Sequence, residues 1–253
     1  MRANSVKRAL REGRRASGTM IFEFATTGIA RIAAAAGAEF AVFDMEHTGW
    51  SMETIRMLMA TSRAADIVPM VRVPALQYHF IARVLDVGAM GIVVPMVADA
   101  AQARTIVESA KYPPVGRRGV AFGIAHDDYR PGGLIDAMKS ADDEVMLIAQ
   151  IETPGGVEQA DAIAAVEGID ALWIGQYDLT ATMGIPGRFE EPAFREATDR
   201  VLQACHRHGK TAVLGSGDPD TLRRGPEAGF SMLVYLTDVW IFQDALRRGL
   251  AAL

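Results

Sequence analysis

The chain of 253 residues is half apolar and contains 24 glycines, which suffices for one full hydrophobic core and is a common length for a single α/β barrel. Its formal net charge of −5 argues against nucleic-acid binding, because proteins that bind nucleic acids are normally basic. The single cysteine, Cys205, excludes an internal disulfide and favours the reducing cytoplasm. The longest apolar runs are too short to span a bilayer, so we expect a cytoplasmic protein without membrane contact.

The first segment of the chain is rich in Lys and Arg between Arg2 and Arg15. No apolar secretion segment follows it, so we interpret it as a solvated first helix rather than a targeting signal. Eight short apolar runs then have the length and composition of strands. They lie at residues 19–23, 40–43, 67–71, 91–94, 145–151, 171–174, 211–214 and 232–236.

Helix signals stand between the first predicted strands. Residues 29–36 are rich in alanine and end at Gly37, and Ser51 is a good N-cap for the next helix. A further helix closes at Gly88, and Asp99 opens another with a glutamine three residues later. This periodic pattern breaks in the segment 111–133, and an irregular stretch of that length is usually functional or a subunit contact.

The centre of the chain carries the clearest chemical signal. The runs 145–151 and 171–174 are each followed by an acid, Glu152 and Asp178, and Thr153 is a good N-cap for a helix between them. Two carboxylates beyond the carboxyl ends of neighbouring parallel strands can hold one divalent cation. The alternative is that Glu152 caps its helix and Asp178 opens the next one.

The last quarter continues the alternation. A helix closed by Gly209 precedes the seventh strand, Asp218 starts the following helix, and Thr237 or Asp238 caps the last one. Eight strand–helix alternations without a break in composition predict one (β/α)8 barrel over residues 1–253. A doubly wound open sheet is the alternative, but the chain has no glycine-rich dinucleotide turn and no Walker-type sequence. We therefore expect closure and no nucleotide cofactor.

Polar residues gather after the predicted strands, where a barrel places its active site. They are Glu23, Asp44, Glu46, His47, Arg72, Gln150, Glu152 and Asp178. His47 lies three residues from Asp44, which could orient its ring and fix its tautomer. Arg72 is costly to bury unless an anion or a metal-bound acid pairs with it.

These residues stand in motifs that resemble the HpcH/HpaI aldolase family, in order and over essentially the whole chain. The motifs are Phe43-Asp44-Met45-Glu46-His47, Val71-Arg72-Val73-Pro74, Leu85-Asp86-Val87-Gly88-Ala89, Val94-Pro95-Met96-Val97, Tyr112-Pro113-Pro114, Arg118-Gly119-Val120, Gln150-Ile151-Glu152-Thr153 and Ile174-Gly175-Gln176-Tyr177-Asp178-Leu179. The family comprises metal-dependent pyruvate aldolases with a (β/α)8 fold, typically assembled as hexamers.

The resemblance implies a role for each matching residue. Glu152 and Asp178 would be the metal ligands, His47 and Asp44 the acid/base pair, Arg72 the contact of the keto or enolate oxygen, and Gln150 part of the substrate site. Gly175, Tyr177 and Leu214 are further candidates for substrate binding. The chain departs from the family pattern at Gln176-Tyr177, where many members have proline after the glycine, and at Met45, where glycine is frequent. The first departure makes the acceptor pocket near Tyr177 unusual.

The sequence thus predicts a metal-dependent aldolase that reversibly cleaves 4-hydroxy-2-oxo acids to an aldehyde and pyruvate, or a close 2-oxo acid such as hydroxypyruvate. The cofactor would be Mg²⁺, Mn²⁺ or Co²⁺, and no lysine directly follows a predicted strand to form a Schiff base. The alternatives are a citrate-lyase-like lyase of CoA thioesters and, more remotely, a non-catalytic barrel used for binding or assembly. The irregular segment and the aromatic last helix, with Trp240 and Phe242, favour a homo-oligomer, and the resemblance implies a hexamer.

Overall fold

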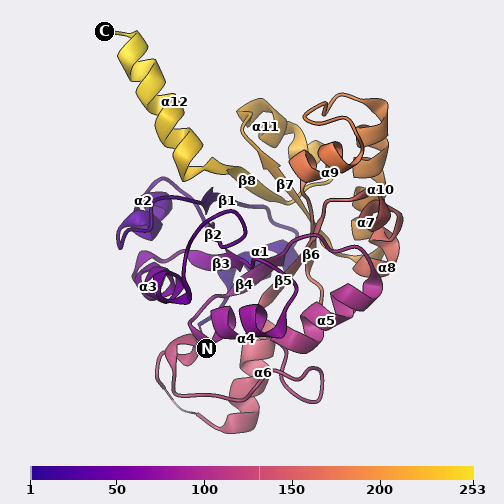
Figure 1. Cartoon of the computed structure of the whole chain (residues 1–253). Helices are drawn as coiled ribbons and strands as arrows, with labels where there is room; N and C mark the ends of the chain where they lie inside the picture. The colour runs from indigo at the N-terminus through magenta and orange to yellow at the C-terminus, as the bar shows by residue number, and fades with distance from the viewer. Residues whose placement is uncertain (1, 131) are drawn as a thin grey trace.

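The computed structural model describes residues 2–130 and 132–253. Its eight strands run parallel and close into one barrel in chain order (Figure 1), with β8 paired to β1. The strands are β1 (Ala16–Ile21), β2 (Phe40–Asp44), β3 (Val68–Arg72), β4 (Gly91–Val94), β5 (Met146–Ile151), β6 (Ala171–Ile174), β7 (Thr211–Ser216) and β8 (Met232–Thr237). The predicted (β/α)8 barrel is confirmed, and the open-sheet alternative is wrong because β8 closes onto β1.

Helices surround the barrel (Figure 1). They are α1 (Ser5–Arg11), α2 (Ile29–Ala35), α3 (Met52–Ser62), α4 (Tyr78–Asp86), α5 (Ala100–Ala110), α6 (Leu134–Glu144), α7 (Pro154–Glu158), α8 (Ala160–Ala164), α9 (Gln176–Thr182), α10 (Pro192–His208), α11 (Pro219–Ala228) and α12 (Asp238–Ala251), with two 3₁₀ turns, η1 (Arg63–Ala65) and η2 (Ala125–Asp127). None of these helices is long and apolar enough to cross a membrane. The single helix predicted after Thr153 is split into α7 and α8.

Buried apolar side chains form two clusters, one on each face of the closed sheet. Alternate strand residues such as Phe40, Val42 and Met70 fill the interior of the barrel, because successive side chains of a strand point to opposite faces. Residues between them, such as Ala41 and Phe43, pack against the surrounding helices. Every residue of β2, β3, β4, β5 and β6 is buried, which explains why those segments show no alternation in sequence.

The first helix is solvated on one side only: Arg8 and Arg11 are exposed as predicted, but the opposite side is buried. Val6 of α1 belongs to the interior cluster, and the Lys7 side chain is buried, where Nζ donates to the carbonyl of Val145 and to Asp170. The buried side chain of Asn4 donates to the carbonyl of Met90. Since Met90 and Val145 directly precede β4 and β5, α1 covers the amino end of the barrel and leaves the carboxyl end open.

The first strand ends two residues earlier than predicted. Beyond Ile21, the backbone N–H groups of Phe22, Glu23 and Phe24 donate to the side chain of Asp238 over 2.7–3.0 Å. A carboxylate therefore takes the place of the neighbouring strand as their acceptor. The same Asp238 begins α12, so β1 and the last helix are tied together at the carboxyl end of the barrel.

The irregular segment is ordered by a buried ion pair. Arg118 donates to Asp86 of α4 over 2.7 Å, and its guanidinium lies 4.8 Å from the centre of the Tyr112 ring. Within the segment, His126 is buried and its Nε2 lies 2.8 Å from the carbonyl of Ala121, so the ring has a structural contact. Pro131 lies outside the described residues.

The last helix projects away from the barrel (Figure 1, yellow). Asp238 is its only buried residue, and Phe242, Leu246 and Leu250 are exposed. Between α12 and α2 runs an apolar groove of about 630 Å³, in which Phe242 packs edge-on against Phe24 with ring centres 5.6 Å apart. The helix thus presents an apolar face that its own barrel does not cover.

Candidate active site

A cavity of about 300 Å³ lies at the carboxyl ends of the strands, the end at which (β/α)8 enzymes carry their active sites. Six of the predicted site residues line it. They are His47, Arg72, Gln150, Gly175, Tyr177 and Asp178. The barrel therefore brings together side chains from segments that are far apart in the sequence, as the positions after the predicted strands had indicated.

Asp44 and Arg72 are the last residues of β2 and β3 and face each other in the parallel register. Arg72 Nε donates to Asp44 Oδ1 over 2.5 Å, and both side chains are buried. Removing Arg72 would leave Asp44 as an uncompensated buried charge. Asp44 therefore fixes the guanidinium of Arg72 at the wall of the cavity, and it is not itself among the lining residues.

Asp44 holds the backbone of His47 rather than its ring, which differs from the prediction. Its Oδ2 accepts the backbone N–H of His47 over 2.9 Å. The acid beside the ring is Glu46, whose Oε2 lies 3.7 Å from His47 Nε2 and 3.1 Å from Arg72 Nη1. Burial raises the pKa of Glu46, while Arg72 and His47 oppose that shift. No specific role was predicted for Glu46, because only its position between Asp44 and His47 distinguishes it in the sequence.

Glu152 follows β5 and is almost fully buried. Its Oε1 accepts from Gln150 Nε2 and its Oε2 from the backbone N–H of Met96, each over 2.8 Å. Met96 has a φ of 56°, a strained conformation for a residue other than glycine. The helix cap is Thr153, whose Oγ1 accepts the N–H of Gly156, so the helix-capping alternative for Glu152 is wrong.

Gly175 makes room for the buried Glu152. A Cβ at Gly175 would lie 2.3 Å from Glu152 Oε1, so a larger residue would displace the carboxylate. Gly175 also precedes α9, whose first turn contains Asp178. Asp178 therefore does stand at the start of a helix, as the alternative reading supposed, but its side chain lines the cavity as well.

The charges of the site fit a hard divalent cation. Burial, with the negative charges of Glu46 and Asp178, raises the pKa of Glu152 to about 7, and a bound cation would relieve that effect. Four carboxylates, those of Asp44, Glu46, Glu152 and Asp178, share the site with the single arginine Arg72. Within residues 2–130 and 132–253, no three His, Cys, Asp or Glu side chains are grouped to hold a metal ion. A divalent cation at this site would need oxygens from water and substrate in addition to carboxylates of the protein.

Leu214 does not line the cavity. Its side chain packs against the outer core cluster, close enough to α11 that a Cβ at Gly225 would lie 2.8 Å from Leu214 Cδ2. The residues of β7 that line the cavity are the next two, Gly215 and Ser216. The prediction that Leu214 belongs to the substrate site is therefore wrong, and the cavity begins one position later along β7.

Several apolar residues of the cavity wall were not expected from the sequence. They are Phe22, Trp173, Leu236 and Trp240. Trp173 and Leu236 belong to predicted strands, where an apolar residue is ordinary, and Trp240 belongs to the aromatic last helix, for which the sequence indicates a subunit contact. No local pattern separates such positions from core positions, so the sequence carried little signal for them.

Three lysines line a different cavity, at the amino end of the barrel. Lys7, Lys111 and Lys210 surround it together with Asp170, and its volume is about 890 Å³. It is larger than the cavity at the carboxyl end, but its lysines donate to backbone carbonyls such as those of Val145 and Ile169. The predicted site residues line the smaller cavity instead.

Comparison with known proteins identifies the family of the chain. The family model described as HpcH/HpaI aldolase/citrate lyase matches residues 19–224. A hydroxypyruvate/pyruvate aldolase from Cupriavidus necator is 32% identical over 248 residues, covering 98% of this chain and 92% of that protein. A 4-hydroxy-2-oxovalerate aldolase from Novosphingobium aromaticivorans is 37% identical over 253 residues, covering 97% and 94%.

A solved structure extends the similarity to three dimensions. The crystal structure of an HpcH/HpaI aldolase from Desulfitobacterium hafniense matches with a TM-score of 0.95 at 32% identity, covering 99% of this chain and 96% of that one. Over nearly the whole chain, sequence and fold thus agree with those of HpcH/HpaI aldolases. The protein is an enzyme of the lyase class and belongs to the HpcH/HpaI aldolase/citrate lyase family.

Proposed function

We propose that the protein is a divalent-metal-dependent aldolase. It reversibly cleaves 4-hydroxy-2-oxo acids to an aldehyde and pyruvate, or a close 2-oxo acid such as hydroxypyruvate. The observation that supports this most is the buried Glu152 within electrostatic reach of Asp178 and Arg72, beside the cavity at the carboxyl end of the barrel. The aldolase names of the two relatives support the same reaction class.

Glu152 and Asp178 are the residues we assign to the metal. Their carboxylates are the hard oxygen ligands that Mg²⁺ prefers, and Mn²⁺ or Co²⁺ are alternatives. When bound there, the ion supplies Lewis-acid polarisation of the keto oxygen of the substrate. Gln150 keeps Glu152 in place through its Nε2.

His47 is the residue we assign to proton transfer. In the cleavage direction, the 4-hydroxyl proton leaves to His47, directly or through a water, while the C3–C4 bond breaks and the C4–O bond becomes the aldehyde carbonyl. The electron pair of the broken bond forms an enolate over C3, C2 and the former keto oxygen. Protonation at C3 then gives pyruvate. The His47 side chain is half exposed at the cavity, which leaves it accessible to substrate.

Arg72 is the residue we assign to the enolate oxygen. Its Nε pairs with Asp44 and its Nη1 with Glu46, which leaves Nη2 to donate to a substrate oxygen. A donor that is already fixed before negative charge develops lowers the barrier without reorganising. The pairing with Asp44 therefore serves as the brace that keeps this donor in position.

Exchange of the methyl protons of pyruvate in D₂O, followed by NMR, tests this function together with pyruvate release from 4-hydroxy-2-oxo acids. We expect a chelator to abolish both activities and Mg²⁺, Mn²⁺ or Co²⁺ to restore them. Full activity in excess chelator, or inactivation by borohydride only in the presence of pyruvate, would indicate a Schiff base and contradict the proposal. Turnover of CoA thioesters without cleavage of 4-hydroxy-2-oxo acids would favour the citrate-lyase-like alternative.

We also propose that the protein acts as a homo-oligomer. The exposed apolar face of α12 and the groove beside it are the supporting observations, because large exposed apolar patches mark interaction sites. The family resemblance suggests a hexamer. The small-molecule substrates would reach a cavity that opens at the same end of the barrel at which α12 begins.

A further inference from the structure

The cavity at the carboxyl end is lined by both charged and apolar side chains. His47, Arg72 and Asp178 line it, and these are the residues to which the 2-oxo acid and its metal are assigned. Phe22 lies beside the guanidinium of Arg72, whereas Trp173, Tyr177, Leu236 and Trp240 add further apolar lining. These last four side chains remain for the fragment of the substrate that becomes the aldehyde.

Two of these apolar side chains are aromatic and only half buried. The rings of Tyr177 and Trp240 lie 6.4 Å apart at an angle of 66°, and the two residues are 55% and 46% exposed. Phe189 packs edge-on against the outer side of Tyr177 at 5.3 Å. Half-exposed aromatic side chains that are braced in this way offer a preformed surface to another ring. Tyr177 also lies where the chain departs from the family pattern.

Leu236 adds a further apolar side chain to the cavity wall, from a strained backbone conformation. Leu236 has a φ of 43°, in the left-handed region that a branched side chain rarely adopts. Gly217 makes room for it, since a Cβ there would lie 2.6 Å from Leu236 Cδ2. This conformation falls where the pairing of β8 with β1 shifts its register, and it leaves Leu236 among the apolar residues that line the cavity.

Charge in the cavity disfavours an aldehyde that carries its own carboxylate. Arg72 is the only arginine among the lining residues, and no lysine is among them. Arg72 is already paired with Asp44 and Glu46, and its remaining nitrogen is assigned to the enolate oxygen. A second carboxylate would find no further cation there, and burying an unpaired charge is strongly unfavourable.

We propose that Tyr177 and Trp240 form an acceptor subsite for an uncharged aromatic aldehyde, an inference that rests on the proposed aldolase function. The aldehyde carbonyl points toward His47 and the 2-oxo acid, and the ring packs against Tyr177, Trp240 and Leu236. In aldol addition, C3 of the pyruvate enolate bonds to the carbonyl carbon, and the carbonyl oxygen takes the proton from His47.

Competition between two aldehydes tests the subsite. With pyruvate and metal, we expect kcat/KM for benzaldehyde to exceed that for 4-oxobutanoate, an aldehyde with a carboxylate, by at least ~10-fold. Trp240→Ala and Tyr177→Ala should lower kcat/KM for benzaldehyde by ~10-fold, with Tyr177→Phe retaining most of it. The control Ile135→Ala removes an exposed apolar side chain from α6 and should leave all rates unchanged. Equal or better use of 4-oxobutanoate, or a loss of proton exchange as large as the loss of addition in Trp240→Ala, would overturn the subsite.

Binding of benzyl alcohol, an unreactive mimic, separates this inference from the proposed function. Ligand-observed NMR should show it bound to the wild type and ~10-fold more weakly to Trp240→Ala. No binding to the wild type would overturn the subsite even in an enzyme that exchanges pyruvate protons. Binding without any proton exchange would support the subsite and overturn the aldolase function instead.

Discussion

Arg72 combines a charge with a fixed orientation, and the two can be separated by substitution. Lysine keeps the charge but lacks the planar fork that pairs with Asp44 and Glu46 at once. We expect Arg72→Lys to bind Mn²⁺ as the wild type does, and to slow both proton exchange and aldol cleavage by ~10²-fold. Calorimetric titration with Mn²⁺ and the two NMR assays measure these quantities.

His47→Ala provides the contrast for this prediction. It should reduce cleavage more than proton exchange, because the proton that His47 moves belongs to the 4-hydroxyl group. If Arg72→Lys exchanged pyruvate protons normally and lost only aldehyde turnover, Arg72 would be an acceptor contact. Arg72→Ala is less informative, because it leaves Asp44 buried without its cation and is expected to destabilise the fold by about 3–5 kcal/mol.

The two assigned metal ligands can be tested without measuring catalysis. Glu152→Gln and Asp178→Asn remove one negative charge each with little change of shape. We expect Mn²⁺ affinity to fall at least ~10-fold in each variant, while thermal unfolding shows that the barrel still forms. Glu158→Gln, on the exposed side of α7, is the matched control and should bind Mn²⁺ normally. Unchanged affinity in both ligand variants would contradict the assignment.

Several of these side chains could be located from the sequence because each ends a strand. Asp44, Arg72, Glu152 and Asp178 interrupt apolar runs or follow them closely, and closure of the barrel alone brings them to one end. Glu46 differs, because its contact with Arg72 depends on how the loop after β2 folds back.

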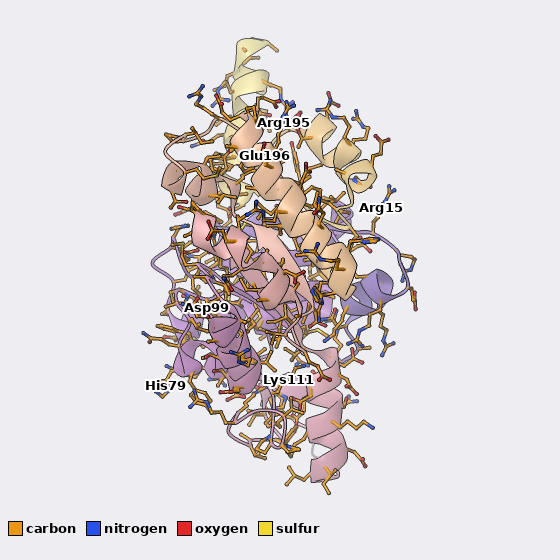
Figure 2. The ribbon with its side chains drawn as sticks, turned by 90° about the vertical axis from the view of Figure 1, so that its right-hand side faces the viewer. Arg15, His79, Asp99, Lys111, Arg195 and Glu196 are labelled. Carbon is orange, nitrogen blue, oxygen red and sulfur yellow. The ribbon has the colours of Figure 1, made fainter. Side chains whose placement is uncertain are left out.

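At the scale of single elements, α5 is followed by a buried lysine whose pKa is lowered. Asp99 caps the start of α5 and Lys111 stands at its end (Figure 2). Burial, with the neighbouring positive charge of Lys7, lowers the pKa of Lys111 from 10.5 to about 8. Between these two values the unfolded chain binds more protons than the folded one, so this lysine makes the protein more stable as the pH rises.

The effect should be visible in urea unfolding from pH 8 to 10.5. A shift from 10.5 to about 8 corresponds to a gain of up to about 3 kcal/mol over that range. We expect Lys111→Met to lack this gain relative to the wild type, with Lys139→Met, on the exposed surface of α6, as the matched control. Parallel pH profiles for the wild type and Lys111→Met would show that Lys111 ionises as it does in the unfolded chain.

Some helices and strand ends could not be predicted from the sequence, either because few of their residues are buried or because a distant side chain ends the strand. The helix α6 was not predicted, although Leu134, Met138 and Ala141 recur in it at helical spacing; of its residues only Ala141 is buried. The end of β1 was misplaced because Asp238, more than 200 positions away, takes the N–H groups that a longer strand would share with its neighbour. Interior and exterior of β7 were confused at Leu214, since both faces of a closed barrel strand are apolar.

At the scale of the whole molecule, α12 predicts assembly. We expect light scattering at micromolar concentration to give an oligomer, with a hexamer suggested by the family resemblance. Phe242→Glu places a charge on the apolar face of α12 and should shift the mass downward. Gln243→Glu adds the same charge at the next position, outside the residues that line the apolar groove, and should not. A monomer in the wild type would contradict the prediction.

The register of the barrel also has a consequence for how errors in folding are handled. β2 and β3 align with Asp44 opposite Arg72, and a slip of one position would turn one of the two side chains to the other face of the sheet. A misaligned chain would then bury charges that have lost their partner. It would be destabilised as well as inactive. Chains with this error are therefore exposed to cellular proteases and chaperones. The ion pair that positions the guanidinium would in this way also favour the correct alignment of β2 and β3 during folding.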